Sequence, residues 1–138
     1  MTTSGSTSGS LSDSTSEERR AAGREIQGRL WPATRSGTTG QFPAAKLAPD
    51  FFDHVLQSAF GDVWSRPGLA VRDRSMITVA VLAALGQSEE LRAHLAGALN
   101  VGLKREELVE VLMHVSVYAG VPATNAALRV AAEVLGTD

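Results

Sequence analysis

The spacing of apolar residues between Asp50 and Leu135 is the feature that most constrains the fold. Apolar side chains recur every three to four residues along this region, as on one face of an α-helix, and no run alternates apolar and polar residues as a strand would. Helices are expected to end where glycine and proline interrupt the pattern, at Arg66-Pro67-Gly68, Gly86, Gly102 and Gly120-Val121-Pro122. The pattern predicts an all-α protein without an internal repeat.

These breaks divide the chain into six predicted helices. They run from Glu17 to Trp31, Asp50 to Val63, Val71 to Leu85, Ser88 to the break at Gly102, Lys104 to Ala119, and Pro122 to Leu135. After its first turn the third helix is apolar on every side, which predicts a buried central helix. The glycines and prolines between Gly37 and Pro49 predict a long loop.

Residues 1–16 differ from the rest of the chain in composition. Thirteen of these 16 residues are Ser, Thr or Gly, and such a segment cannot bury enough apolar surface to offset the entropy lost on ordering. We therefore predict that residues 1–16 are a disordered tail. Residues 17–138 are an appropriate length for one domain.

Composition excludes several classes of protein. The 138-residue chain has 13 Lys and Arg against 15 Asp and Glu, a net charge of -2, and lacks the basic surface that binds nucleic acid. Without cysteine it cannot form a disulfide, a Cys-ligated zinc site or a thiol nucleophile. The longest apolar run, Met76 to Leu85, is about half the ~18 residues that a membrane span requires. A cytoplasmic protein with no nucleic-acid or membrane partner is expected.

Glu90 and His94 are the first candidate acid–base pair. Four residues separate them, so in the predicted helix both side chains lie on one face. A carboxylate in that position can orient an imidazole and raise its pKa, which gives an acid–base pair that works near neutral pH. The alternative is that Glu90 only complements the positive N-terminus of its helix and that His94 is a half-buried packing residue.

His114 and Tyr118 form a second pair at the same spacing, on the apolar stripe of their helix. A buried donor without a partner costs roughly 1–3 kcal/mol. The pair is therefore predicted either to line a pocket wall or to form a hydrogen bond within the core. His54 lies beside the apolar stripe of the Phe-rich helix and is expected to be a surface or packing residue.

Three arginines, Arg66, Arg72 and Arg74, crowd the start of the third helix. Arginine binds carboxylates through two parallel hydrogen bonds, so this group could hold an anionic substrate. The alternatives are a solvated helix start and an ion pair at a subunit contact.

No metal or cofactor is predicted. Glu90, His94 and His114 could supply ligands, but they lack the spacing of a metal motif such as H-E-x-x-H. The sequence also contains no glycine-rich phosphate loop, serine nucleophile elbow or nucleotide fingerprint.

Small side chains are frequent in the predicted helices, and alanine methyl groups bury little area. A monomer of this size would therefore have a thin core, and self-association is predicted. These small residues are Ala80, Ala83, Ala84, Ala93, Ala96, Gly97, Ala98, Ala126, Ala127, Ala131 and Ala132.

Five short motifs follow one another between Val63 and Ala123. They are Val63-Trp64-Ser65-Arg66-Pro67-Gly68-Leu69, Arg72-Asp73-Arg74-Ser75, Glu90-Leu91-Arg92-Ala93-His94, Ala98-Leu99-Asn100-Val101-Gly102-Leu103 and Tyr118-Ala119-Gly120-Val121-Pro122-Ala123. In order and spacing they resemble the carboxymuconolactone decarboxylase family. The resemblance extends from about Asp50 to Leu135, whereas Leu30 to Pro49 does not resemble the family's usual N-terminal segment.

The resemblance implies the all-α AhpD-like fold, with an antiparallel helix hairpin at its centre, and a homo-oligomer, commonly a trimer or hexamer. It also implies a cofactor-independent decarboxylase of a small anionic lactone, in which His94 is the proton donor or oxyanion partner and Glu90 orients it. The implied substrate-binding residues are Trp64, Arg66, Arg72, Arg74, His114 and Tyr118, with an arginine holding the substrate carboxylate.

One activity of related proteins is excluded. AhpD-like peroxidases use a C-x-x-C motif just before the matching histidine, and here Gln87 and Glu90 occupy the two cysteine positions. A thiol peroxidase is therefore ruled out.

Two other functions remain open beside the lactone decarboxylase. One is a cofactor-free tailoring enzyme (a cyclase, isomerase or decarboxylase) for a larger metabolite, which a pocket lined by Phe51, Phe52 and Trp64 would favour. The other is a non-catalytic, oligomeric binding protein, which would be favoured if Glu90 and His94 faced neither each other nor a cavity.

Overall fold

The computed structural model describes residues 14–32 and 43–138, and every regular element within these two ranges is helical. The elements are α1 (Ser16–Leu30), α2 (Ala44–Leu47), α3 (Pro49–Val55), η3 (Leu56–Trp64), α4 (Val71–Leu85), α5 (Ser88–Asn100), α6 (Arg105–Ala119) and α7 (Val121–Leu135). Because α3 continues directly into η3, the six predicted helices are all present and the all-α class is confirmed. The short α2 is additional, in the segment predicted to be a loop.

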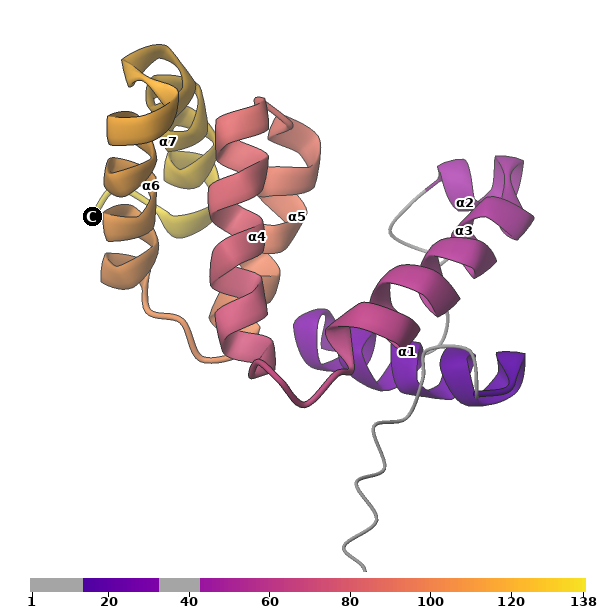
Figure 1. Cartoon of the computed structure of the whole chain (residues 1–138). Helices are drawn as coiled ribbons and strands as arrows, with labels where there is room; N and C mark the ends of the chain where they lie inside the picture. Colours follow the sequence, from indigo (N-terminus) through magenta and orange to yellow (C-terminus); the bar gives the residue numbers. More distant parts are fainter. Residues whose placement is uncertain (1–13, 33–42) are drawn as a thin grey trace, which may run out of the picture.

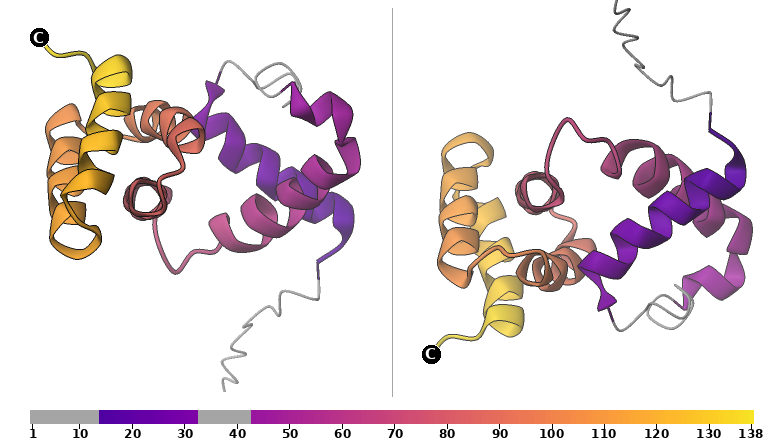
Figure 2. Two further views of the ribbon diagram at one scale, coloured as in Figure 1. Left: turned by 90° about the horizontal axis from the view of Figure 1, so that it is seen from above. Right: turned by 90° about the horizontal axis from the view of Figure 1, so that it is seen from below.

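The helices are arranged in three neighbouring groups (Figure 1). α1 lies across the continuous helix α3–η3, the antiparallel hairpin α4–α5 occupies the centre, and the hairpin α6–α7 lies on the far side; Figure 2 shows the same order from above and below. Gly86 makes the tight turn between α4 and α5 with φ of 70°, which favours glycine. The expected central antiparallel hairpin is therefore confirmed.

α5 contributes to two hydrophobic cores. Leu91 and Leu95 are buried in the larger core, which α5 shares with α4, α6 and α7. Ala93 and Val101 pack against the smaller core, which consists of Ile26, Leu30, Trp31, Phe60 and Val71. The N-terminal helices are thus attached to the C-terminal bundle largely through α5.

α1 lies very close to the wide turns of η3. η3 is a π-helix, in which the Ser65 N–H donates to the Phe60 carbonyl five residues earlier, at 3.2 Å. The close approach requires glycine, since a Cβ on Gly61 would be 2.3 Å from the Arg19 carbonyl oxygen and one on Gly23 would be 2.4 Å from that of Leu56. Bidentate ion pairs hold α1 to this continuous helix: Arg19 pairs with Asp62 of η3 at 2.8 and 2.7 Å, and Arg20 pairs with Asp53 of α3 at 2.8 and 2.9 Å.

Four predicted helix starts are shifted by one residue: Glu17 to Ser16, Asp50 to Pro49, Lys104 to Arg105 and Pro122 to Val121. The Thr15 hydroxyl accepts from the Glu18 N–H at 3.2 Å, so Thr15 caps α1 and the end of the predicted tail belongs to the fold. Residues 1–13, the rest of that tail, lie outside the described residues. Pro49 begins α3 and places Asp50 in its first turn, whereas α5 begins at Ser88 as predicted.

The prediction that the third helix is buried on every side is wrong for the single chain. α5, α6 and α7 cover one side of α4, where Val79 and Ala83 are buried. On the other side Ile77 and Val81 are each 48% exposed, and Leu85 is 66% exposed. In the described ranges, no helix is both long enough and apolar enough to span a membrane.

Candidate active site

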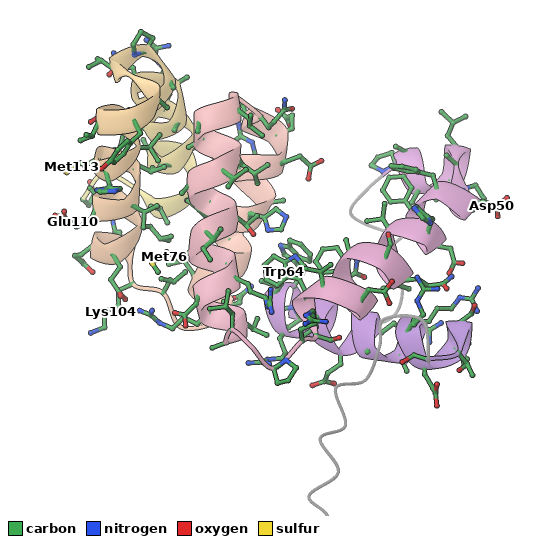
Figure 3. The ribbon with its side chains drawn as sticks, in the orientation of Figure 1. Asp50, Trp64, Met76, Lys104, Glu110 and Met113 are labelled. Atoms are coloured by element: carbon green, nitrogen blue, oxygen red, sulfur yellow. The ribbon has the colours of Figure 1, made fainter. Side chains whose placement is uncertain are left out.

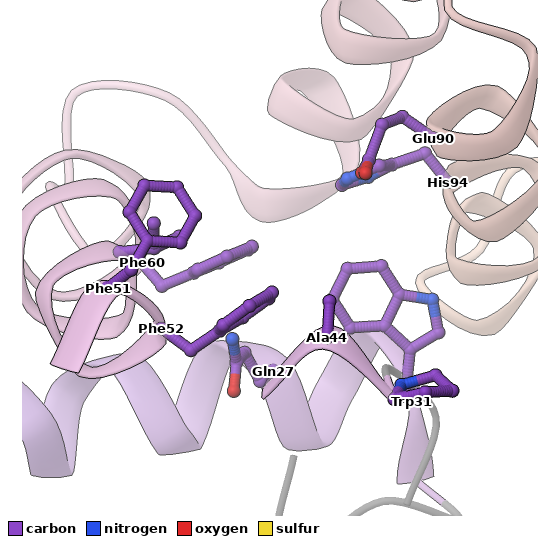
Figure 4. A pocket seen from close by; sticks show the side chains of 10 residues that line it. Gln27, Trp31, Ala44, Phe51, Phe52, Phe60, Glu90 and His94 are labelled. Atoms are coloured by element: carbon purple, nitrogen blue, oxygen red, sulfur yellow. The ribbon is translucent and has the colours of Figure 1, made fainter. Parts of the chain in front are cut away.

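A cavity of about 380 Å³ lies between α5 and the N-terminal helices (Figure 4). This volume is in the ordinary range for small-molecule sites. Its wall is mainly aromatic and aliphatic, with polar groups from only a few positions. The lining residues are Gln27, Trp31, Pro43, Ala44, Phe51, Phe52, Val55, Phe60, Glu90 and His94.

α5 presents Glu90 and His94 to this cavity from one face, as their four-residue spacing predicts. Leu91 and Leu95, on the adjacent face, are 1% and 0% exposed in the larger core and fix the rotation of the helix. His94 is only 8% exposed, whereas Glu90 is exposed. Figure 4 shows both side chains across the cavity from Phe51, Phe52 and Phe60.

The imidazole of His94 lies between two tryptophans. Trp64 stacks on it with ring centroids 6.1 Å apart and planes at 24°, and Trp31 meets it edge-on at 5.0 Å and 71°. Figure 3 places Trp64 between η3 and the central hairpin, so the sequence of η3 directs this ring towards α5. Nδ1 of His94 is buried and has no hydrogen-bond partner within the described residues.

Burial lowers the pKa of His94 from 6.5 to about 4, because the protein interior solvates the charged imidazolium poorly. The structure contains no hydrogen bond between Glu90 and His94, both of which are described. The expectation that Glu90 raises the pKa of His94 towards neutrality is therefore wrong for this chain. At neutral pH the imidazole is uncharged and can both donate and accept a hydrogen bond.

His114 and Tyr118 are not in this cavity. α6 turns Leu108, Leu112 and Val115 inward and leaves the pair outside, with Tyr118 82% exposed and the two rings 5.4 Å apart. The predicted hydrogen bond within the core is wrong and Tyr118 faces outward, because the apolar stripe is wider than the buried face; the predicted pocket wall holds for His114 alone. His114 lines a separate groove of about 740 Å³ between α4 and α6, with Met76, Ile77, Ala80, Glu107, Glu110, Val111 and Met113.

The three arginines also lie away from the cavity in the described part of the chain. Arg72 forms an ion pair with Glu107, which raises the pKa of Arg72 above its usual value, and Arg74 donates to the Arg66 carbonyl at 3.2 Å. Arg66 is exposed. The structure thus supports helix-start and interhelical roles for these side chains and does not place them at the lining of the cavity.

Metal-ligating side chains are not gathered in the described ranges. No group of three or more His, Cys, Asp or Glu residues there is arranged to hold a metal ion. The set Glu90, His94 and His114 is divided between two different pockets.

Gln27, Trp31 and Phe60 line the cavity, but the sequence did not predict them as site residues. Trp31 is the predicted end of a helix, and Gln27 lies on the same polar helix. A tryptophan before a proline at the end of a mostly polar helix is only a weak indication of a functional site. Trp31 reaches the cavity only because α1 docks on α5. Phe51 and Phe52 do line the cavity, and Trp64 reaches it through its contact with His94.

Fold and site together define a class. An all-helical chain with an antiparallel hairpin at its centre, and a histidine one turn after a glutamate on the second helix of that hairpin, is an AhpD-like protein of the branch without cysteine. More particularly, the chain belongs to the carboxymuconolactone decarboxylase family, whose sequence model matches residues 49–133. The predicted family membership is thereby confirmed.

Three relatives illustrate the range of the family. The chain is 51% identical over 85 residues to the 4-carboxymuconolactone decarboxylase of Acinetobacter baylyi, covering 62% of this chain and 63% of that protein. It is 37% identical over 78 residues to nitrosuccinic acid decarboxylase npaB of Metarhizium robertsii, covering 55% and 53%. It is 31% identical over 95 residues to a 15.0 kDa protein of Paracoccus denitrificans, covering 67% and 71%. The chain thus spans less than two thirds of the length of either decarboxylase.

Proposed function

We propose that this protein is a decarboxylase of a small carboxylic acid, with a carboxylated lactone such as 4-carboxymuconolactone as the first candidate substrate. The observation that carries the proposal is the cavity onto which α5 directs both the buried His94 and the exposed Glu90. The names of two relatives, both decarboxylases, support it.

The substrates in these two names share one chemical feature. When a carboxymuconolactone loses carbon dioxide, the electron pair of the broken C–C bond moves through a double bond into the lactone carbonyl. In nitrosuccinic acid the same pair moves into the nitro group. Negative charge therefore collects on an oxygen in both cases, and a carbon later takes a proton. Such an enzyme needs a hydrogen-bond donor at the oxygen and a source of protons.

We assign the donor role to His94. With a pKa of about 4, its imidazole is neutral at neutral pH and retains one N–H. A neutral donor in a buried site strengthens its hydrogen bond as charge develops on the substrate oxygen. Of the two roles expected for His94, oxyanion partner and proton donor, its lowered pKa supports the first.

We assign proton delivery to Glu90. Its side chain is exposed, so water reaches it, and it lines the same cavity one turn before His94. In this scheme carbon dioxide leaves, the electron pair rests on the oxygen bonded to His94, and the substrate carbon then takes a proton from a water molecule that the Glu90 side chain orients. Solvent protonates the resulting hydroxide, so each turnover consumes one proton and balances without an oxidant or reductant.

A larger metabolite is the second candidate substrate. Five of the lining residues, Trp31, Phe51, Phe52, Val55 and Phe60, give the cavity an apolar wall that exceeds the needs of a small polar acid. This favours the tailoring-enzyme alternative more than a binding protein without activity, because Glu90 and His94 both face the cavity.

We also propose that the protein self-associates through the outer faces of α4 and α6. Ile77 and Met113 line the groove between these helices, and Val81, Leu85 and Val117 continue it at 48%, 66% and 72% exposure. With Tyr118, these side chains form a continuous exposed apolar surface, and such surfaces mark sites of protein–protein contact. A second copy of the chain is the occupant that we propose for this face.

Release of carbon dioxide from 4-carboxymuconolactone, with no added metal or cofactor, tests the function. We expect turnover by the wild-type protein and at least a ~100-fold loss in His94→Ala. Nitrosuccinic acid serves as the second substrate. Absence of turnover on both acids, by protein shown to be folded, would overturn the decarboxylase assignment, and near-native activity of His94→Ala would overturn the role of His94.

A further inference from the structure

Four aromatic side chains form a closed ring at the base of the cavity. Phe60 stacks on Trp64 at 5.7 Å, Trp64 on His94 at 6.1 Å, His94 meets Trp31 at 5.0 Å, and Trp31 meets Phe60 at 6.1 Å, all between ring centroids. We call these residues the aromatic quartet. Three of its members can be followed in Figure 4. His94 is the one member that ionises, and the other three enclose it.

Trp31 is fastened to the backbone of α5 beside His94. Its Nε1–H donates to the carbonyl of Ala93, the residue before His94, at 2.9 Å. Gly97 provides the space for the indole, since a Cβ there would be only 3.2 Å from Nε1. Trp31 is 7% exposed, so both the ring and its hydrogen bond are shielded from water. A side chain held in this way has one orientation, and it restricts the orientation of the imidazole that it touches.

A second contact attaches the same end of α1 to α5 without touching His94. The Asn100 side chain donates through Nδ2 to the Leu30 carbonyl at 2.7 Å. Asn100 and Trp31 therefore share the task of docking α1, whereas only Trp31 adds contact with the imidazole. This difference provides a matched control.

Trp31 lies outside the segment that the family shares. The family match covers residues 49–133, so α1 and the Pro43–Ala44 turn supply their part of the site from outside the matched segment. We propose that Trp31 is a positioning residue, which holds the imidazole of His94 in a single orientation and out of water so that its neutral N–H faces the substrate. This inference rests on the proposed function, but the state of His94 that it describes can be measured without any substrate.

The electrostatic consequence follows from the groups around His94. Trp31, Phe60 and Trp64 carry no charge, and Glu90 is the one other ionisable side chain among the described lining residues. Removal of the Trp31 ring would admit water to the imidazole, and its pKa would then return from about 4 towards 6.5. A residue that merely stabilised the fold would leave this pKa unchanged in the folded protein.

Titration of the His94 ring by NMR, in the full-length protein without substrate, is the first experiment. Trp31→Leu retains apolar volume but removes the ring, Trp31→Phe retains a ring edge but removes the hydrogen bond, and Asn100→Ala weakens docking alone. We expect the pKa of His94 to rise by more than one unit in Trp31→Leu, to stay low in Trp31→Phe, and to be unchanged in Asn100→Ala. Steady-state kinetics should show about a tenfold loss of kcat in Trp31→Leu, partly restored in Trp31→Phe.

Two results would overturn the proposal. One is a His94 pKa that stays near 4 in folded Trp31→Leu; the other is a rise of equal size in Asn100→Ala, which would reduce Trp31 to a docking residue. If Trp31→Leu does not fold, the comparison of Trp31→Phe with Asn100→Ala decides, because only a positioning role predicts that kcat differs between them. A pKa that behaves as expected in a protein without decarboxylase activity would refute the function and retain the role of Trp31.

Discussion

Replacing Gly61 by alanine is expected to destabilise the protein and to loosen α1. The new Cβ would lie 2.3 Å from the Arg19 carbonyl oxygen and 3.0 Å from its carbonyl carbon, whereas ordinary contact begins at 3.4 Å. The obstacle is backbone and not a flexible side-chain end, so α1 and η3 must separate by about 1 Å. Such a shift would lengthen the bonds of Arg19 to Asp62, now 2.7 and 2.8 Å, beyond hydrogen-bond range.

The expected cost is about 2–3 kcal/mol. Overpacking against an unyielding neighbour costs about 1–3 kcal/mol and sometimes more. The lengthened ion pairs add to this cost, whereas the better helix propensity of alanine stabilises the helix by up to about 1 kcal/mol. For a domain of this size the melting temperature should fall by roughly 10 °C. The same shift would move Trp31, so the proposed decarboxylase activity should decrease at temperatures where the variant remains folded.

Urea denaturation and calorimetry, with Gly68→Ala as the control, measure this effect. A Cβ on Gly68 would meet nothing within 4 Å, and Gly68 has no left-handed φ, so its replacement should change stability by less than about 0.5 kcal/mol. If Gly61→Ala were as stable as Gly68→Ala, the close docking of α1 on η3 would be refuted, together with the argument that glycine is required there.

Three further predictions follow from the site and the surface. The pKa of His94 is near 4 in the folded protein and about 6.5 in the unfolded chain, so the unfolded state binds more protons as the pH falls. His94 should therefore lower the free energy of unfolding by about 2 kcal/mol between pH 7 and pH 5. Urea titrations at both pH values should show this loss in the wild type and not in His94→Gln. Glu90→Gln should reduce kcat at least tenfold with little change in KM, as rapid-quench and steady-state assays can show. A fall in KM equal to the fall in kcat would contradict a role for Glu90 in proton delivery. Wild-type protein should elute as an oligomer in light-scattering chromatography, and Val117→Asp, at a site 72% exposed, should yield a folded, smaller species; an unchanged mass would place the interface elsewhere.

The sequence by itself determined the helices and the direction in which α5 aims its side chains. Apolar periodicity and helix-breaking residues are local properties, so six helices, the helix end at Gly86, and the shared face of Glu90 and His94 could all be predicted. The five motifs between Val63 and Ala123 also identified the family, because their order and spacing persist in the sequence whatever the rest of the chain does.

The tertiary structure alone decided the chemistry of the site. Periodicity shows which face of a helix is apolar but not which neighbour covers it, so the exposed side of α4 and the outward position of Tyr118 on α6 were not predicted. Arg72 pairs with Glu107, 35 residues away, and Trp31 bonds to Ala93, 62 residues away. The second contact brings the indole against His94, whose burial keeps its pKa near 4 where local spacing suggested a value near neutrality. Desolvation depends on every group that surrounds the imidazole, and only the docking of separate helices brings those groups together.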